Sequence, residues 1–457
     1  MLTEDTAAPS TPPTEPGATA TGARFSLVTV TMTTTQLLDL SLTEITLDAP
    51  LDHRDPAGAT IEIFARVITA EGGTNLPYLV FLQGGPGHEA PRLAAGGPPW
   101  LERALKDFQV VMLDQRGTGN SSPIGGRVVR DGSEVRAEVR APLAGLDASA
   151  QAEYLSHFRA DEIVNDAELV REALGAQKWT LLGQSFGGFT SLHYLSVHPE
   201  SLAGAILTGG LSAVQHPIDD VYATTWQTMI AKSEDYYRRF PGDRQRIVEL
   251  TRLCEQGRIT LPNGDVLSAE RFRTLGHHLG SQHGAQELHT LLSLPHDSAA
   301  FAHDLAGSLP FEGRNPLYAV LHESSYADGV VTNWSAERTM PDRVREDPTL
   351  LAGEHIHRSV FREDFELSAF AEVADVLAQR QWNQLYFPDK LAQADVPVAA
   401  SVYYGDAYVP LEYSMETAAI LPNCRTWVTS QYEHNGLRMG TEVIDHLIGL
   451  LKGHRWL

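Results

Sequence analysis

The stretch Trp179-Thr-Leu-Leu-Gly-Gln-Ser-Phe-Gly-Gly-Phe189 predicts a short buried strand that turns sharply into a helix. Its first four residues are an apolar run, and Gly183-Gln184-Ser185-Phe186-Gly187 fits the pattern G-x-S-x-G. In a nucleophile elbow, that pattern places a serine at the tip of a strained strand-to-helix turn. The glycines leave room for the strand and helix to approach closely. We therefore predict that Ser185 is a nucleophile rather than part of an ordinary glycine-rich turn.

Composition indicates a large globular protein and excludes several classes of partner. The 457 residues are long enough to bury a large core, alone or with a second domain. A net charge of −23 argues against nucleic acid or an anionic membrane surface as partner. No run approaches about 18 apolar residues, so no membrane span is predicted.

The cysteines and the N-terminal residues predict a cytoplasmic location. Only Cys254 and Cys424 are present, so no disulfide framework is implied and a reduced protein is the simpler interpretation. The first residues are acidic and no apolar segment follows them, which excludes an ordinary secretory signal.

The order of the apolar segments predicts the fold class. Strands are expected near residues 25–32, 40–47, 60–68, 76–82, 108–113, 179–182, 203–208, 396–404 and 425–429. Helices are expected near 98–107, 149–174 and 441–451, with a polar loop from the end of the second apolar strand to about residue 147. This alternation predicts an α/β fold with a mostly parallel central sheet flanked by helices.

Four segments follow from this pattern. Residues 1–22 form a low-complexity tail that we predict to be disordered. Residues 23–210 and 381–457 form the two parts of the α/β core. Helical patterns replace strands over 211–380, which predicts a cap domain over the strand ends, where ligands bind in open α/β sheets.

A serine nucleophile needs a base and an acid that orients the base. In hydrolases built on the nucleophile elbow, the acid and then the histidine follow the serine along the chain. Asp406 comes directly after a buried strand and His434 lies between the last strand and the last helix, so we assign them these roles. The other candidates for the acid do not directly follow a buried strand; they are Asp389, Asp395 and Asp445.

An oxyanion site needs two backbone N–H donors. One is expected from Phe186, directly after the nucleophile, and the other from the loop after the first parallel strand. That loop is Gln83-Gly-Gly-Pro-Gly87. Pro86 has no N–H, so the donor is Gly84 or Gly85, and we favour Gly85. The loop fits neither of the common phosphate-binding patterns.

Five motifs together resemble the proline iminopeptidases, in particular the longer bacterial type. They are Gln83-Gly-Gly-Pro-Gly87, Asp114-Gln-Arg-Gly-Thr-Gly-Asn-Ser121, Gly183-Gln-Ser-Phe-Gly-Gly188, Gly405-Asp406 and Glu433-His-Asn-Gly-Leu-Arg438. The resemblance covers roughly residues 45–457 and departs from the usual pattern at Gln83, where the loop more often opens with histidine. It implies an α/β-hydrolase fold and a serine exopeptidase without cofactor.

The resemblance also implies cap carboxylates that bind the substrate's free amine. Glu323 and Glu354 occupy two stretches that look like those of the family, with Glu323 favoured; both could equally be ordinary glutamates. Asp114 and Arg116 are expected to brace their loop structurally. His277, His278, His283 and His289 lack the spacing of a metal site, so no metal is expected.

The leading hypothesis is therefore an exopeptidase that releases an N-terminal residue, preferentially proline, from small peptides with a free N-terminus. An esterase or amino-acid amidase with the same three residues is the first alternative, since cap contacts decide the substrate. A non-catalytic ligand-binding protein of the same fold is the second. The sequence makes no prediction of oligomeric state.

Overall fold

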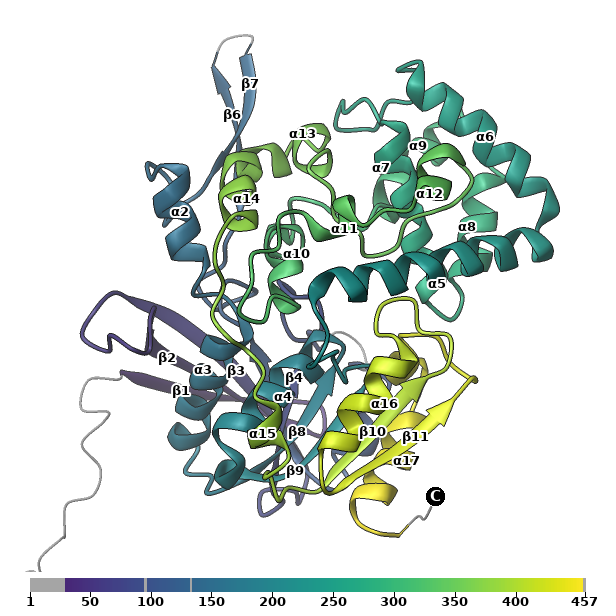
Figure 1. Cartoon of the computed structure of the whole chain (residues 1–457). Helices are drawn as coiled ribbons and strands as arrows, with labels where there is room; N and C mark the ends of the chain where they lie inside the picture. Colours follow the sequence, from purple (N-terminus) through teal and green to yellow (C-terminus); the bar gives the residue numbers. More distant parts are fainter. Residues whose placement is uncertain (1–28, 94–96, 132–133, 455–457) are drawn as a thin grey trace, which may run out of the picture.

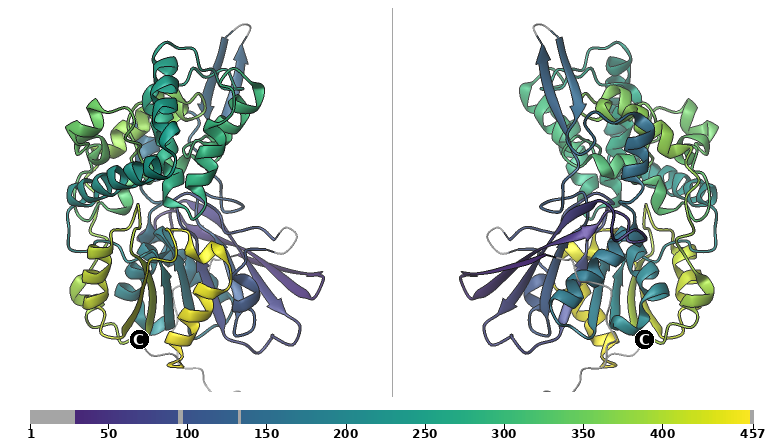
Figure 2. Two further views of the ribbon diagram at one scale, coloured as in Figure 1. Left: turned by 90° about the vertical axis from the view of Figure 1, so that its right-hand side faces the viewer. Right: turned by 90° about the vertical axis from the view of Figure 1, so that its left-hand side faces the viewer.

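The computed structural model describes residues 29–93, 97–131 and 134–454. A nine-stranded sheet with helices on both faces forms one half of the molecule, and a body of helices lies over one edge of the sheet (Figure 1; Figure 2). The predicted α/β fold is confirmed. The predicted tail, residues 1–22, lies outside the described residues, as does the beginning of the strand predicted at 25–32. No described helix is both long enough and apolar enough to cross a membrane.

The parallel part of the sheet places its carboxyl ends at the edge below the cap. In sheet order its strands are β5 (Gln109–Asp114), β4 (Tyr78–Leu82), β8 (Trp179–Gln184), β9 (Leu202–Thr208), β10 (Val398–Tyr403) and β11 (Cys424–Thr429). The antiparallel strands β3 (Thr60–Ala70), β2 (Leu40–Pro50) and β1 (Val30–Leu37) extend the sheet beyond β5. The chain leaves β4 for β5 on one side and later returns to β8 on the other, which makes the β4–β8 edge the switch point where ligands bind.

Strand β4 shows why the sequences of these parallel strands are continuous apolar runs. Val80 and Leu82 pack into the cluster that contains α3 (Ala160–Ala173) and α4 (Phe186–Val197). Leu79 and Phe81 pack into the opposite cluster, with α1 (Leu101–Ala104) and α17 (Glu442–Leu451). Successive side chains point to opposite faces, so a strand covered on both faces is apolar throughout. The first face also carries α15 (Pro388–Leu391) and α16 (Leu411–Ile420).

The segment between β9 and β10 is mainly helical, as predicted for the cap. Its longest helix, α5 (Ile218–Arg239), lies across the top of the sheet in Figure 1. The division of the chain at residues 210 and 380 stays a prediction. The other helices are α6 (Pro241–Glu255), α7 (Ala269–Arg273), α8 (Gly284–Leu292), α9 (Ala299–Ser308), α10 (Pro316–Leu321), α11 (Ser335–Arg338), α12 (Asp342–Glu346), α13 (Val360–Glu363) and α14 (Ala371–Ala378).

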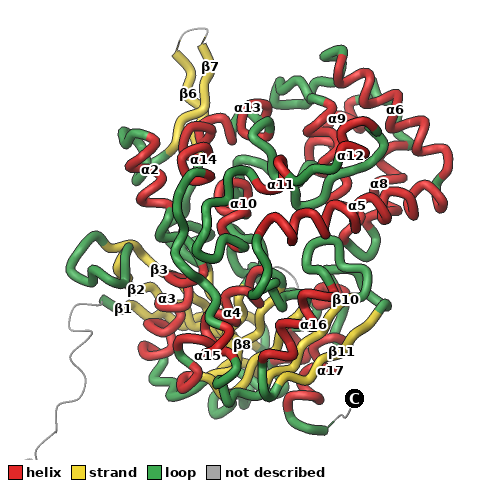
Figure 3. The backbone as a smooth tube through the Cα atoms, viewed as in Figure 1, coloured by secondary structure: helices red, strands yellow, loops and turns green. Residues whose placement is uncertain are grey.

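Two local predictions are wrong. The loop predicted up to residue 147 contains a hairpin of β6 (Gly126–Asp131) and β7 (Glu134–Val139), which projects beside the cap (Figure 3). Most of its residues are exposed or half-buried, so it lacks the alternation that identifies a strand on a core. The single helix predicted over 149–174 is α2 (Ala148–Leu155) followed by α3. Between them the carbonyl of His157 accepts a hydrogen bond from Arg116 Nη1 at 2.7 Å, outside any helix.

Arg116 and Asp166 form a buried ion pair below the loop that follows β5. Arg116 Nε and Nη2 donate to the two oxygens of Asp166 at 2.7 and 2.6 Å, and neither side chain is more than 1% exposed. The carbonyls of Leu51 and His157 take further hydrogen bonds from Arg116 Nη1 at 2.7 Å. Arg116 therefore joins the middle of α3, and the segment before that helix, to the end of β2. It does not pair with Asp114, whose carboxylate accepts from the N–H groups of Ala90 and Asn120 instead.

Replacing Arg116 should destabilise the protein strongly. In Arg116→Met, the Asp166 carboxylate stays buried without its guanidinium, which costs about 3–5 kcal/mol of unfolding free energy. Urea unfolding measures the loss. Arg54→Met is the matched control, because Arg54 pairs with Asp52 at the surface and is 67% exposed; surface pairs are worth at most about 1 kcal/mol. Equal losses in the two variants would contradict the importance of the buried pair.

Candidate active site

Ser185 lies in the turn between β8 and α4. Its backbone conformation is one that residues other than glycine rarely adopt. Its φ is 56° and its ψ is −123°. Its N–H donates to Thr208 O at 3.0 Å, which ties the turn to β9. A Cβ on Gly187 would lie 1.8 Å from Leu82 O, so α4 can approach β4 this closely only with glycine at that position. The glycines of the motif therefore fix where the serine side chain projects.

The structure brings Ser185, His434 and Asp406 into one hydrogen-bonded chain. Ser185 Oγ lies 2.8 Å from His434 Nε2, and His434 Nδ1 lies 2.8 and 3.0 Å from the two oxygens of Asp406. A carboxylate only accepts, so Nδ1 carries the proton and Nε2 can accept from the serine hydroxyl. The three residues follow β8, β11 and β10 respectively, at the shared carboxyl edge of the sheet.

Asp406 is held in place by backbone donors and acts strongly on His434. Its Oδ1 accepts from the N–H groups of Tyr408 and Val409 at 2.9 and 3.0 Å. Burial lowers the pKa of His434, but the charge and hydrogen bond of Asp406 outweigh burial and raise that pKa above its usual value, with Glu354 adding to the rise. The imidazole is therefore a stronger base than an isolated histidine.

Two backbone N–H groups beside the serine donate no hydrogen bond within the described residues. They belong to Phe186, the first residue of α4, and to Gly85. The loop of Gly85 contacts the elbow, because a Cβ on Gly84 would lie 2.9 Å from Ser185 Cβ. The φ of Gly85 is 132°, in the region that favours glycine. Both N–H groups are therefore available to a ligand oxygen.

Glu354 presents a buried negative charge in the same part of the molecule. Tyr318 OH donates to its Oε1 at 2.6 Å, and ring nitrogens of His277 and His322 lie 3.8 and 3.9 Å from its oxygens. Burial raises the pKa of Glu354, but the contact with His277 and the charges of His322, His277 and His434 lower it to about 2. The carboxylate is therefore ionised at neutral pH, with its side chain only 13% exposed.

Glu323 is also buried, but its carboxylate is already bound by α11. Its Oε1 accepts from Ala336 N–H at 2.9 Å. Burial raises the pKa of Glu323, and the bonds from Ala336 and Thr332 reduce that rise. Burial also raises the pKa of Tyr222, and the charges of Glu323 and Glu354 both add to it. Both glutamate charges thus act on Tyr222, and Glu354 is the more available carboxylate of the two.

Sequence reasoning missed the partners of Glu354. Tyr318 lies in the same short stretch of sequence as Glu323. That closeness in sequence could have indicated that Tyr318 also lies in the site. In the sequence His277 belongs to a cluster of histidines, but in the structure its Nε2 lies 3.2 Å from Tyr318 OH, whereas His289 Nδ1 lies 2.8 Å from Asp243. These histidines serve separate contacts because they lie on different cap elements.

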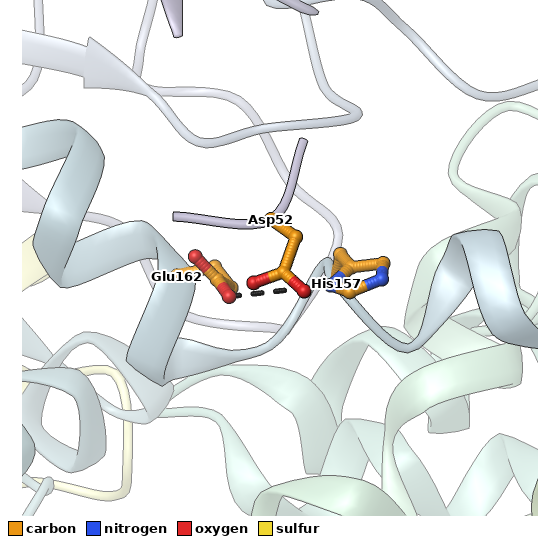
Figure 4. A group of neighbouring side chains, drawn as sticks. All are labelled: Asp52, His157 and Glu162. Carbon is orange, nitrogen blue, oxygen red and sulfur yellow. Dashed lines mark ion pairs between the residues drawn. The ribbon is translucent and has the colours of Figure 1, made fainter. Parts of the chain in front are cut away.

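One group of side chains has the composition of a metal site: Asp52, His157 and Glu162 (Figure 4). His157 Nδ1 lies 4.0 Å from Glu162 Oε1. Both oxygens of Asp52 already accept from Arg54, at 2.8 and 2.9 Å, and this contact is the main reason that the pKa of Asp52 falls to about 2. A guanidinium on the same carboxylate opposes a bound cation, so we interpret the group as an ion-pair network.

The sheet, the cap and the hydrogen-bonded chain of serine, histidine and aspartate define an α/β hydrolase, and a family model described as the alpha/beta hydrolase fold matches residues 77–266. The chain is 41% identical over 420 residues to a proline iminopeptidase of Aeromonas sobria, covering 88% of this chain and 94% of that protein. It is 30% identical over 432 residues to proline iminopeptidase aneH of Aspergillus aculeatus, covering 88% and 92%. The chain belongs to the proline iminopeptidase family.

The backbone strain at Ser185 predicts an unusual order of stability between two variants. Glycine normally destabilises a regular element by about 0.5–1 kcal/mol relative to alanine. At Ser185, glycine relieves a conformation that costs about 1–3 kcal/mol for other residues. We therefore expect Ser185→Gly to be more stable than Ser185→Ala in urea unfolding. A less stable Ser185→Gly would show that the turn is unstrained.

Proposed function

We propose that the protein is a serine aminopeptidase that releases an N-terminal residue, preferentially proline, from short peptides. The observation that carries the proposal is the position of an ionised, buried carboxylate, Glu354, close enough to His434 to raise its pKa. The hydrogen-bonded chain supplies a nucleophile and its base, and the carboxylate supplies a partner for a free amine. Relatives named proline iminopeptidase over most of their length support this substrate.

In this proposal Ser185 Oγ attacks the carbonyl carbon of the N-terminal residue while His434 Nε2 takes the serine proton. Asp406 keeps the imidazole in the required tautomer and stabilises its positive charge. The N–H groups of Phe186 and Gly85 donate to the oxyanion of the tetrahedral intermediate. His434 then protonates the departing amine, and water attacks the acyl-enzyme with His434 again as base.

The free amine of the substrate selects the N-terminal residue. We assign its direct contact to Glu354, because that carboxylate is ionised and hydrogen-bonded mainly by side chains. Glu323 adds a second buried carboxylate, whose charge, like that of Glu354, raises the pKa of Tyr222. A buried ammonium paired with a buried carboxylate is favourable only when both are present. A blocked N-terminus would therefore leave Glu354 buried without a partner, and the substrate would bind poorly.

Removing the Glu354 charge should cost amine recognition. Glu354→Gln should lower kcat/KM for proline arylamide by about 30-fold to several thousand-fold, as truncation of a buried charge pair does. Glu323→Gln should lose less, because its carboxylate is engaged by α11. A chromogenic assay on proline arylamide measures both, with Ser185→Ala as the blank.

A p-nitrophenyl ester without an amine separates this proposal from its alternative. The ester should still be hydrolysed by Glu354→Gln, since it makes no use of the carboxylate. N-acetyl-proline arylamide should resist the wild-type enzyme. Hydrolysis of the ester without release of proline would assign the protein as an esterase. Unchanged aminopeptidase activity in both glutamine variants would contradict the amine assignment.

The pH dependence should report His434. Only the neutral imidazole accepts the serine proton, so kcat/KM rises with pH through the pKa of His434. That pKa is raised above its usual value, so the acidic limb should have its midpoint above about pH 6.5. Glu354→Gln removes one charge that raises it, and the limb measured with the ester should move to lower pH. A limb that stays or moves upward would contradict this coupling.

We also infer a reducing, cytoplasmic compartment. Cys254 and Cys424 are both free, and burial raises the pKa of each thiol to about 12, which keeps both protonated. Recovery of the activity outside the cell rather than in the cytoplasmic fraction would contradict this inference.

A further inference from the structure

A cavity of about 470 Å³ opens beside the catalytic elbow. Its wall combines the loop after β4, through Gln83 and His88, with Gln184, which directly precedes Ser185. The segment after His434 closes it with Leu437 and Arg438. The wall also contains aromatic and proline residues, among them Phe81, Trp100, Pro91 and Pro98, and the charged residues Glu89, Arg92 and Arg314. Glu354 is not part of this wall.

Arg438 places an available positive charge in the cavity wall. Its side chain is exposed, and Nη2 donates one hydrogen bond to Gln184 Oε1 at 3.0 Å. No carboxylate among the described residues pairs with it. The other arginines of the wall differ, since Arg314 and Arg92 both pair with Glu89, at 2.5 and 3.5 Å. Arg438 therefore has donors free for a ligand anion.

Arg438 is also close to the reacting serine. Gln184 Oε1, its hydrogen-bond acceptor, lies 2.8 Å from the position of a Cβ on Gly84. That same position lies 2.9 Å from Ser185 Cβ. The guanidinium therefore binds the side chain of the residue that directly precedes Ser185.

Two opposite charges thus act on His434, and only that of Arg438 belongs to the cavity wall. Glu354 raises the pKa of His434 and Arg438 lowers it, and desolvation lowers the pKa of Arg438 while Tyr318 and Glu354 raise it. The two charges are therefore within electrostatic range of each other and of His434. A short peptide with both ends free carries the complementary pair, an ammonium at one end and a carboxylate at the other.

We propose that this cavity receives the part of the substrate beyond the scissile bond and that Arg438 binds its terminal carboxylate. The enzyme then prefers dipeptides and other short peptides with a free C-terminus. This assignment rests on the aminopeptidase function proposed above. A planar guanidinium suits a carboxylate, because it can donate two parallel hydrogen bonds. A local cation is also needed because the protein as a whole, with net charge −23, repels anions.

The test compares prolyl-glycine with prolyl-glycinamide, which differ only in the terminal charge. With the full-length wild-type enzyme we expect kcat/KM to favour the free acid by about ten- to a hundredfold, the worth of a hydrogen bond to a charged group. Arg438→Gln should reduce the ratio to about one, mainly through KM for the free acid. Arg438→Lys keeps the positive charge but cannot donate the two parallel hydrogen bonds of a guanidinium, so it should give an intermediate ratio.

Arg314→Gln is the matched control, because it removes a positive charge from the same wall but one already paired with Glu89. It should keep the wild-type ratio. A ratio near one in the wild-type enzyme, or an unchanged ratio in Arg438→Gln, overturns the proposal. So does an equal loss on both peptides with the ratio preserved, which would make Arg438 a positioning residue for Gln184.

Failure of the underlying function gives a different result. If neither peptide nor proline arylamide releases proline, the aminopeptidase proposal fails and the carboxylate assignment fails with it. If proline is released from all three substrates without preference for the free acid, only the carboxylate assignment fails.

Discussion

The close approach of α4 to β4 is the constraint on which the site depends. A side chain on Gly187 would overlap the carbonyl of Leu82, and one on Gly188 would lie 2.5 Å from Gly210 O. Without side chains there, the helix begins directly behind the strand ends and forces Ser185 into its strained turn. The same approach brings the glycine loop after β4 against Ser185. Ser185 and both available N–H donors are therefore positioned by one packing contact.

Charged side chains near that contact determine the electrostatic environment of His434. Two opposite charges act on His434: the buried carboxylate of Glu354 raises its pKa and the guanidinium of Arg438 lowers it. In low dielectric such fields are stronger than at the surface. In the proposed mechanism, these two charges orient a substrate with separated charges before its carbonyl reaches Ser185. Orientation of this kind contributes to catalysis, because the bound substrate has already lost the translational and rotational freedom that the reaction would otherwise have to restrict.

The sequence predicted those features that depend on the chain's local pattern. Strands buried on both faces, such as β4, are apolar throughout, and Ser185, Asp406 and His434 each follow such a strand or its neighbour. The parts it missed depend on contacts between distant segments. The helix after residue 148 breaks because Arg116 takes the carbonyl of His157, and β6–β7 has polar residues on both faces. Which of Glu323 and Glu354 binds the amine stays a prediction, but the contact that engages Glu323 could not be read from the sequence, since only the folded chain brings Ala336 N–H to it.

The hairpin and α2 belong to the chain before α3, yet they lie with the cap (Figure 1). Helix α2 packs against α14, and Arg380 pairs with Glu153 across this boundary at 2.8 Å. Arg159 adds hydrogen bonds to the carbonyls of Ala327 and Asn383 at 2.6 and 3.1 Å. The cap is therefore joined to the sheet by two separate excursions of the chain, and a swing about one hinge would strain the other. A rigid swing of the cap about the connections at β9 and β10 would therefore break the contacts that α2 and Arg159 make with it.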